Sequence, residues 1–258
     1  MEFSFSVHVS ALLADQRFYA ALAIAVLSGV VRGFSGFGSA LIYIPLASAV
    51  YGPKIAAASF VLIDFFCTIP IAIRAYPSCN RREVFPLTVA TAVTIPLGAL
   101  LLRYVEPVWL RWFIAVMILG LLAVLVSGLR YRKQASLPLT IGVGLISGIS
   151  GGATTLTGPI VIVYWLGSPS GAAATRANLI VFFLLTDAIV AVTYQVQGLL
   201  TPESIVLALL IALPFLIALT AGARLFHGAS ELTYRRIAYA IVAAAALVSL
   251  PLFDGVLR

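Results

Sequence analysis

Long apolar stretches follow one another along the chain, with only short polar gaps between them. Most of them reach the ~20 residues that an α-helix needs to cross the hydrocarbon core of a bilayer. The apolar segments run over Tyr19–Val50, Ile55–Ile73, Val84–Leu102, Val108–Leu129, Leu139–Leu166, Ala172–Val196, Ile205–Phe226 and Ile237–Phe253. The pattern predicts an all-α polytopic membrane protein.

Composition supports this prediction. The chain is 62% hydrophobic and 10% charged, whereas a soluble domain carries about 25% charged residues. Its formal net charge of +7 comes partly from short basic gaps such as Arg81-Arg82 and Arg130–Lys133, which are typical of cytoplasmic loops and not of a nucleic-acid surface. We therefore expect the bilayer as a partner and no nucleic acid. The expected location is the cell inner (plasma) membrane, without a cleaved signal peptide.

Two of the segments are interrupted by small residues, at Gly33–Gly38 and at Gly148–Gly152. Each of these segments is close to thirty residues long, so it either crosses once as a bent helix or enters and leaves on one side as two half-helices. Backbone that leaves helical geometry at membrane depth has to be buried in protein or line a wet cavity. Small-residue packing between helices is the alternative reading of these glycines.

The same order of features occurs twice along the chain. A broken segment is followed by a helix with an acid inside it, Asp64 or Asp187, then by a helix with a glycine and by one that opens with arginine. Internal duplication of this kind is common in secondary transporters. We predict a single transmembrane domain of two repeats, over about residues 19–133 and 138–253, each a broken or re-entrant helix plus three transmembrane helices. Chance similarity between apolar helices is the alternative.

The distribution of basic residues favours re-entrant segments. If all eight segments cross, the two sides carry eight and seven Lys or Arg residues; if the two broken segments are re-entrant, they carry ten and five. The second arrangement follows the positive-inside rule better. It leaves three full spans in each half, and an odd number of spans inverts the second half relative to the first. The expectation is therefore two inverted repeats.

The breaks are also the predicted binding site. Each precedes a new half-helix, restarting near Gly38-Ser39 and near Ala153–Thr155. Helix N-termini carry free N–H groups and partial positive charge, so two of them meeting near the midplane would bind an anion, assisted by hydroxyls that include Thr157. The predicted substrate-binding residues are Arg32, Gly33, Ser35, Gly36, Gly38, Ser39, Ser150, Gly151, Gly152, Thr154, Thr155, Arg176 and Asn178.

Three charged positions inside the apolar segments carry further hypotheses. Arg32 beside the first break complements an anionic substrate or, alternatively, pairs with Asp64 or Asp187. The two acids are candidates for coupling transport to protons or another cation, with a structural ion pair as the alternative. Arg176 either faces the site or extends to the membrane interface. No zinc motif, nucleotide loop or nucleophile elbow occurs, so no metal, cofactor or enzyme activity is expected.

The chain resembles the TauE/SafE family, the sulfite and organosulfonate exporters. The resemblance rests on Gly33-Phe34-Ser35-Gly36-Phe37-Gly38-Ser39, on Ser150-Gly151-Gly152 and on the two four-segment halves. It implies a secondary transporter for small sulfur-containing anions such as sulfite, sulfoacetate or other organosulfonates, with export as the expected direction. By the same resemblance, the two breaks would hold the substrate.

Other functions remain open at this stage. An anion channel, a transporter of another small organic anion such as a carboxylate, and a membrane-embedded enzyme or subunit are the alternatives. The enzyme lacks a nucleophile and base pair in the sequence. The exact substrate, the coupling ion and the oligomeric state, including a homo-oligomer, are left open.

Overall fold

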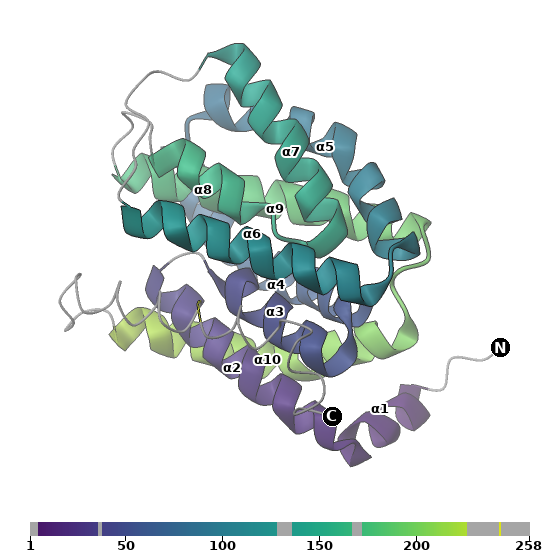
Figure 1. The fold of residues 1–258 in the computed structure, drawn as a ribbon. Coiled ribbons are helices and arrows are strands. Elements are labelled where there is room, and N and C mark those ends of the chain that lie inside the picture. The colour runs from purple at the N-terminus through teal and green to yellow at the C-terminus, as the bar shows by residue number, and fades with distance from the viewer. Residues whose placement is uncertain (1–4, 36–37, 128–135, 167–171, 226–242, 244–258) are drawn as a thin grey trace.

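The computed structural model describes residues 5–35, 38–127, 136–166, 172–225 and 243. Within these ranges the chain is helical and contains no strand (Figure 1). The helices are α1 (Phe5–Ala14), α2 (Gln16–Ser35), α3 (Ser39–Tyr51), α4 (Pro53–Ala75), α5 (Arg81–Tyr104), α6 (Pro107–Ser127), α7 (Leu137–Thr154), α8 (Gly158–Leu166), α9 (Ala172–Val196) and α10 (Pro202–Leu225), with a 3-10 turn, η1 (Tyr76–Ser78).

Local sequence explains where several helices begin. α4, α6 and α10 each open on a proline, a residue whose fixed φ suits the first helical position and whose missing N–H costs nothing there. α5 opens with Asn80 as its N-cap, a residue favoured at that position. The side chain of Asn80 accepts a hydrogen bond from the N–H of Arg82 at 3.2 Å and donates one to Glu83 Oε1 at 2.8 Å.

The prediction of a multi-pass membrane protein is confirmed by length and composition. Among the described residues, six stretches are long and apolar enough to span a bilayer, and α3 is a shorter apolar helix. Apolar side chains also face outward at helical spacing, as at Val89, Val93 and Leu97 on α5, which is the arrangement expected of a surface in contact with lipid. The eighth predicted segment, Ile237–Phe253, lies outside the described residues.

The helices are interleaved rather than stacked in chain order. α4 packs against α9, α5 packs along α7, and α2 packs along α10. Figure 1 shows α2 and α10 at one side of the bundle and α5 and α7 at the other, with α4 and α9 between them. Helices from the beginning of the chain therefore find their main partners in its second half.

Glycines bring the backbones of these pairs into contact. A Cβ on Gly152 of α7 would lie 2.1 Å from the carbonyl oxygen of Ile95 on α5, and one on Gly98 of α5 would lie 2.2 Å from that of Ile149. In the other pair, a Cβ on Gly222 of α10 would lie 2.2 Å from the carbonyl oxygen of Val30. Neither pair could keep this spacing with a larger residue. We call these contacts the α5–α7 seam and the α2–α10 seam.

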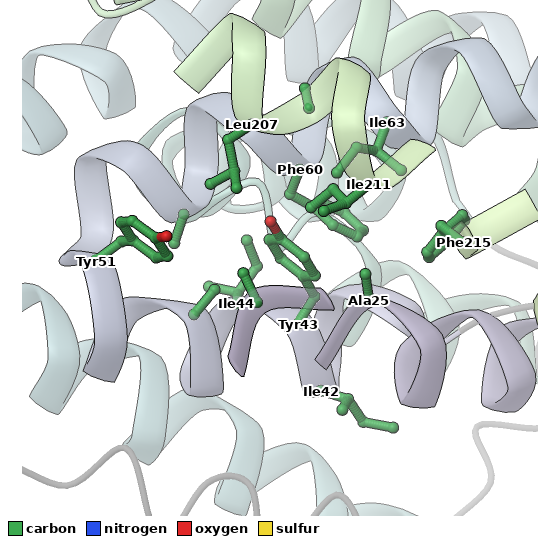
Figure 2. Packing of buried hydrophobic residues seen from close by; sticks show 14 of the residues in the cluster. Ala25, Ile42, Tyr43, Ile44, Tyr51, Phe60, Ile63, Leu207, Ile211 and Phe215 are labelled. Atoms are coloured by element: carbon green, nitrogen blue, oxygen red, sulfur yellow. The ribbon is translucent and has the colours of Figure 1, made fainter. Parts of the chain in front are cut away.

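A buried apolar cluster holds α3 against α2, α4 and α10 (Figure 2). Tyr43 of α3 is fully buried and packs on Phe60 of α4, with ring centroids 5.2 Å apart. Its hydroxyl satisfies its hydrogen bonding with Ser59 Oγ at 3.0 Å. The half-helix α3 is thereby fixed to the helix that carries Asp64.

The predicted position of the second break is wrong. The helix does not stop at Gly148–Gly152, because α7 continues to Thr154, and the chain restarts as α8 at Gly158 instead of near Ala153–Thr155. Gly148 and Gly152 instead lie in the α5–α7 seam. The prediction took glycine as a helix breaker, but in a close helix pair glycine removes a steric clash without ending the helix.

Candidate substrate site

The first break lies where it was predicted. α2 ends at Ser35 and α3 begins at Ser39, directly after Gly38. Gly38 has φ 97° and ψ −3°, a conformation that only glycine reaches without a steric penalty. Gly38 has no side chain to cap the N-terminus of α3, so the first N–H groups of this helix have no helical partner.

The second break is built from threonines and supported by serines. Thr155 ends α7 in the left-handed region, with φ 58° and ψ 7°. The hydroxyls of Ser147 and Ser150 donate to the carbonyl oxygens of Thr157 and Leu156, at 3.0 and 2.7 Å. These bonds satisfy backbone acceptors that have no helical partner. The break is thus held in place by the last turns of α7.

A cavity of about 30 Å³ lies between the two breaks. Both half-helices begin at it, because Ser39 of α3 and Gly158 of α8 are among its lining residues. Its ionisable lining consists of Arg32, Asp64 and Asp187. The remaining lining residues are Gly38, Ala40, Leu41, Phe60, Thr155, Leu156, Thr157, Pro159, Ile162 and Phe183. A volume of this size holds about two water molecules.

Arg32 is the cation of this cavity, and only 6% of it is exposed. Its guanidinium donates to Ser39 Oγ at 2.8 Å, forms an ion pair with Asp64 and donates to Thr68 Oγ1. The ion pair joins α2 to α4, and the Ser39 bond joins α2 to the start of α3. Arg32 therefore connects both sides of the first break to the helix that carries the first acid.

The two acids meet in the same place. Asp64 and Asp187 are 3% and 5% exposed, and both line the cavity. Oδ2 of Asp187 has no hydrogen-bond partner among the described residues. The predicted ion pair of Arg32 is thus present with Asp64, and the second acid completes a cluster of three buried ionisable side chains.

The structure gathers part of the predicted site at this cavity and leaves part of it elsewhere. Arg32, Gly38, Ser39, Thr155, Asp64 and Asp187 all line it. Gly33 is buried in α2 next to Arg32, whereas Gly36 and the side chain of Ser35 lie outside what the structure describes.

Among the α7 residues, Thr154 donates to the carbonyl of Ser150 at 2.9 Å, and a Cβ on Gly151 would lie 2.1 Å from Thr157 Cγ2. Ser150, Gly151, Gly152 and Thr154 thus support the break from within α7.

Arg176 and Asn178 do not line the cavity. Arg176 is exposed on α9. Asn178 is fully buried, and its side chain accepts from the N–H of Asn80 at 2.7 Å and donates to Glu83 Oε2 at 3.2 Å. Trp165 at the end of α8 donates to the same carboxylate oxygen at 3.1 Å. These hydrogen bonds connect the end of α8 and the beginning of α9 to the N-terminus of α5.

Sequence reasoning missed three residues beside the acids. Thr68 lies one turn after Asp64 and contacts Arg32. Phe60 and Phe183 line the cavity, and each lies four residues before an acid, in Phe60-Val-Leu-Ile-Asp64 and Phe183-Leu-Leu-Thr-Asp187. Residues four apart share a helix face. The recurring pattern of an aromatic residue followed four positions later by aspartate could have identified both aromatic residues.

Other chemistry has no support among the described residues. They contain no group of three or more His, Cys, Asp or Glu side chains placed to hold a metal ion. Cys67 is buried and Cys79 is half-buried, and both are free thiols. What the site offers is one guanidinium, two carboxyls, two half-helix N-termini and hydroxyls around a small enclosed space.

Comparison with protein families gives a match over most of the chain. The family described as Sulfite exporter TauE/SafE matches residues 21–249. Searches of curated proteins and of solved structures gave no match. The matched range includes both breaks, both acids and every lining residue of the cavity.

Proposed function

Because the chain belongs to the sulfite exporter TauE/SafE family, we propose that it moves small sulfur-containing anions, such as sulfite, sulfoacetate or other organosulfonates, by alternating access. The family consists of transporters and not of enzymes, and its transport is of the sulfite and organosulfonate export type. The chain is a multi-pass membrane transporter of this family. Its proposed membrane is the cell inner (plasma) membrane, and its proposed direction is export.

The observation that carries the proposal is the cavity between the two breaks. Two half-helices begin at it and Arg32 lines it. Free N–H groups and the positive end of the helix dipole bind anions, and a guanidinium presents paired donors that match sulfonate or sulfite oxygens as they match carboxylate and phosphate. Discontinuous helices with their N-termini directed at an anion are a known transporter design.

The cavity also places a condition on binding. It has room for about two waters, which is less than an organosulfonate needs, and Arg32 is already paired with Asp64. A substrate therefore requires the half-helices to part and the ion pair to open. Motion of α3 or α8 relative to α4 and α9 would admit the anion.

Inverted repeats would supply that motion, and several contacts support them. Each seam joins the first helix of one half to the fourth helix of the other: α7 to α5, and α2 to α10. The contacts within the seams correspond, since Gly144 meets Thr91 and Gly29 meets Phe215. The acids on α4 and α9 also meet. We propose that the halves, over about residues 19–133 and 138–253, are inverted repeats with re-entrant broken helices.

Counterflow in proteoliposomes tests the function. Purified protein is reconstituted with unlabelled sulfite, methanesulfonate or acetate inside, and uptake of the labelled anion is measured. We expect sulfite or methanesulfonate to drive transient accumulation, which a channel would not produce. Equal or better counterflow with acetate would instead assign the transporter to carboxylates, and a simple leak of anions without accumulation would assign it to the channels.

Variants of Arg32 test the site. Arg32→Gln is expected to reduce counterflow at least 100-fold, because the buried cation is lost, and Arg32→Lys to retain a fraction, because lysine keeps the charge but not the paired donors. Arg74→Gln is the matched control, since Arg74 is exposed in the last turn of α4. If Arg32→Gln transported as well as the control while remaining folded by size-exclusion chromatography, the site would be misplaced.

A further inference from the structure

The buried cluster at the cavity has more acid groups than cationic partners. Arg32 contributes one positive charge, and Asp64 and Asp187 contribute two carboxyls to the lining of the same cavity. Oδ1 of Asp64 accepts a hydrogen bond from the guanidinium of Arg32. Oδ2 of Asp187 has no hydrogen-bond partner in the part of the chain that the structure describes. An unpartnered buried carboxylate oxygen indicates a site for a positively charged ligand.

Charge balance gives the number of protons in this cluster. Two buried carboxylates beside one guanidinium would leave a net negative charge in a low-dielectric cavity, so one of the two carboxyls holds a proton. Two carboxyls with one proton carry a single negative charge, which the guanidinium of Arg32 balances. The substrate-free cluster is then neutral overall, the state that costs least in a low-dielectric environment.

No further charged side chain lines the cavity among the described residues; Arg111 of α6, which packs against α4, is buried but does not line it. On α4 and α9 the nearest titratable neighbours of the acids are Cys67, one turn from Asp64, and Tyr194, whose hydroxyl donates to the carbonyl of Gly152 at 2.8 Å. Arg32 of α2 pairs with Asp64. The hydroxyl of Tyr43 on α3 is hydrogen-bonded to Ser59. The charged residues of α5 and α10 that the structure describes lie in the first or last turns of these helices.

A proton fits the cluster better than a metal ion does. Asp64 is in direct contact with the guanidinium, so a sodium ion on the acid pair would lie beside a fixed positive charge. The described residues also contain no group of three or more His, Cys, Asp or Glu side chains placed to hold a metal ion. A proton needs only one carboxylate oxygen and neutralises the acid at the position where the charge lies.

On the basis of the proposed function, we propose that Asp64 and Asp187 form a proton-binding pair that releases Arg32 to the substrate, so that one proton crosses with each monoanion and no net charge moves. A proton from the open side forms an O–H bond on Asp64, and the ion pair with Arg32 breaks. The guanidinium then pairs with the incoming anion. On the other side the anion leaves, the proton returns to water and the ion pair forms again.

The proton pair can be tested without any substrate. Infrared spectroscopy of the wild-type protein at neutral pH is expected to show a carboxylic-acid C=O band that shifts in deuterated buffer. Asp187→Asn and Asp64→Asn should each remove it, and Glu106→Gln should leave it unchanged, because Glu106 is exposed before α6. A wild-type spectrum with no protonated-carboxyl band at neutral pH would overturn the proposal whether or not the protein transports sulfonates.

The coupling is tested in proteoliposomes with methanesulfonate, which remains a monoanion across the pH range, so any pH dependence belongs to the protein. With the membrane potential clamped to zero, an imposed pH gradient should drive accumulation toward the alkaline side. In a cell with an alkaline interior this gradient opposes export, so export by the coupled cycle follows the outward concentration gradient of the anion. Changing the potential alone should leave the initial rate unchanged within twofold. A rate that followed the potential and ignored the pH gradient would refute the proton step while leaving the transport function intact.

A double variant gives the sharpest test. Asp64→Asn with Asp187→Asn imitates the fully protonated pair and leaves Arg32 free, so it should keep counterflow but lose accumulation driven by the pH gradient. Its uptake should instead follow the membrane potential, because the site now gains charge without a proton. Gradient-driven accumulation that persisted in the double variant would place the coupling elsewhere. If neither protein exchanged any sulfur anion, the proposed function would fail, and the infrared result would still decide the proton pair.

Discussion

The two breaks occupy corresponding places in their segments but are stabilised by different groups. At the first, Gly38 supplies a backbone conformation with φ 97° and Arg32 supplies a charge. At the second, Thr155 takes the left-handed conformation without glycine, and Ser147 and Ser150 bond the freed carbonyls. The first break thus supplies the positive charge of the cavity, whereas the second is stabilised by hydrogen bonds from the helix that precedes it.

The difference suggests a division of roles between the halves. Each half brings one half-helix N-terminus and one acid to the cavity, but the guanidinium comes from the first half alone. Loss of a serine hydroxyl at the first break should therefore act mainly on binding, and loss of one at the second mainly on folding. The following predictions test this difference, beginning with the largest expected effect.

The largest effect is expected in the α5–α7 seam behind the second break. Gly152→Ala places a Cβ 2.1 Å from the carbonyl oxygen of Ile95 and should destabilise the protein by about 3 kcal/mol, since backbone cannot yield as a flexible side chain does. Gly142→Ala, on the same helix with nothing within 4 Å, should be neutral or stabilising by up to about 1 kcal/mol. Thermal unfolding in detergent measures both, and equal melting temperatures would remove the seam as the support of this break.

A smaller effect is expected from one hydroxyl at each break. Ser150→Ala leaves the carbonyl of Leu156 without its 2.7 Å donor, which should cost about 1–3 kcal/mol of stability and leave anion affinity unchanged. Ser39→Ala removes the 2.8 Å contact with Arg32 and should weaken sulfite binding about tenfold while stability changes by less than about 1 kcal/mol. Melting curves and sulfite titrations on both variants would contradict the division of roles if the two effects were exchanged.

The smallest effect is expected from the left-handed residues. Gly38→Ala should cost about 1–2 kcal/mol, because an L-residue is strained at φ 97°. Thr155→Gly should stay within about 0.5 kcal/mol of wild type, since relief of strain at φ 58° is offset by the added freedom of the unfolded chain. Chemical unfolding of the two proteins side by side is the measurement, and a large loss for Thr155→Gly would show that its side chain supports the turn.

The first break could be predicted from the sequence because its geometry is local. A glycine flanked by small residues beside a charge inside an apolar segment predicts non-helical backbone, and Gly38 lies there in the structure. The pairing of Arg32 with Asp64 was one of two readings, and nothing in the sequence alone separates a structural ion pair from a substrate contact. The structure contains the ion pair, and transport still has to open it.

The second break was predicted at the wrong position because the glycines used to place it are there for packing against a helix distant in the sequence. Gly148 and Gly152 are required by the backbone of α5, and sequence alone cannot distinguish a glycine that admits a neighbour from one that ends a helix. The better signal was Gly158-Pro159, since proline is favoured in the first turn of a helix. The partners of Asn178 on α5 could not be predicted, because they depend on tertiary packing.

The two seams also constrain how the chain is assembled during synthesis. α2 ends at Ser35, but the helix that covers its glycine face begins only at Pro202, so nearly the whole protein has to be made before that pair can close. N-terminal segments are synthesised and inserted first, and long sequence separation between partners slows folding. Arg32 can find Asp64 early, on the next long helix, and this ion pair would keep the charge of α2 satisfied in the bilayer while its final neighbour is still being translated.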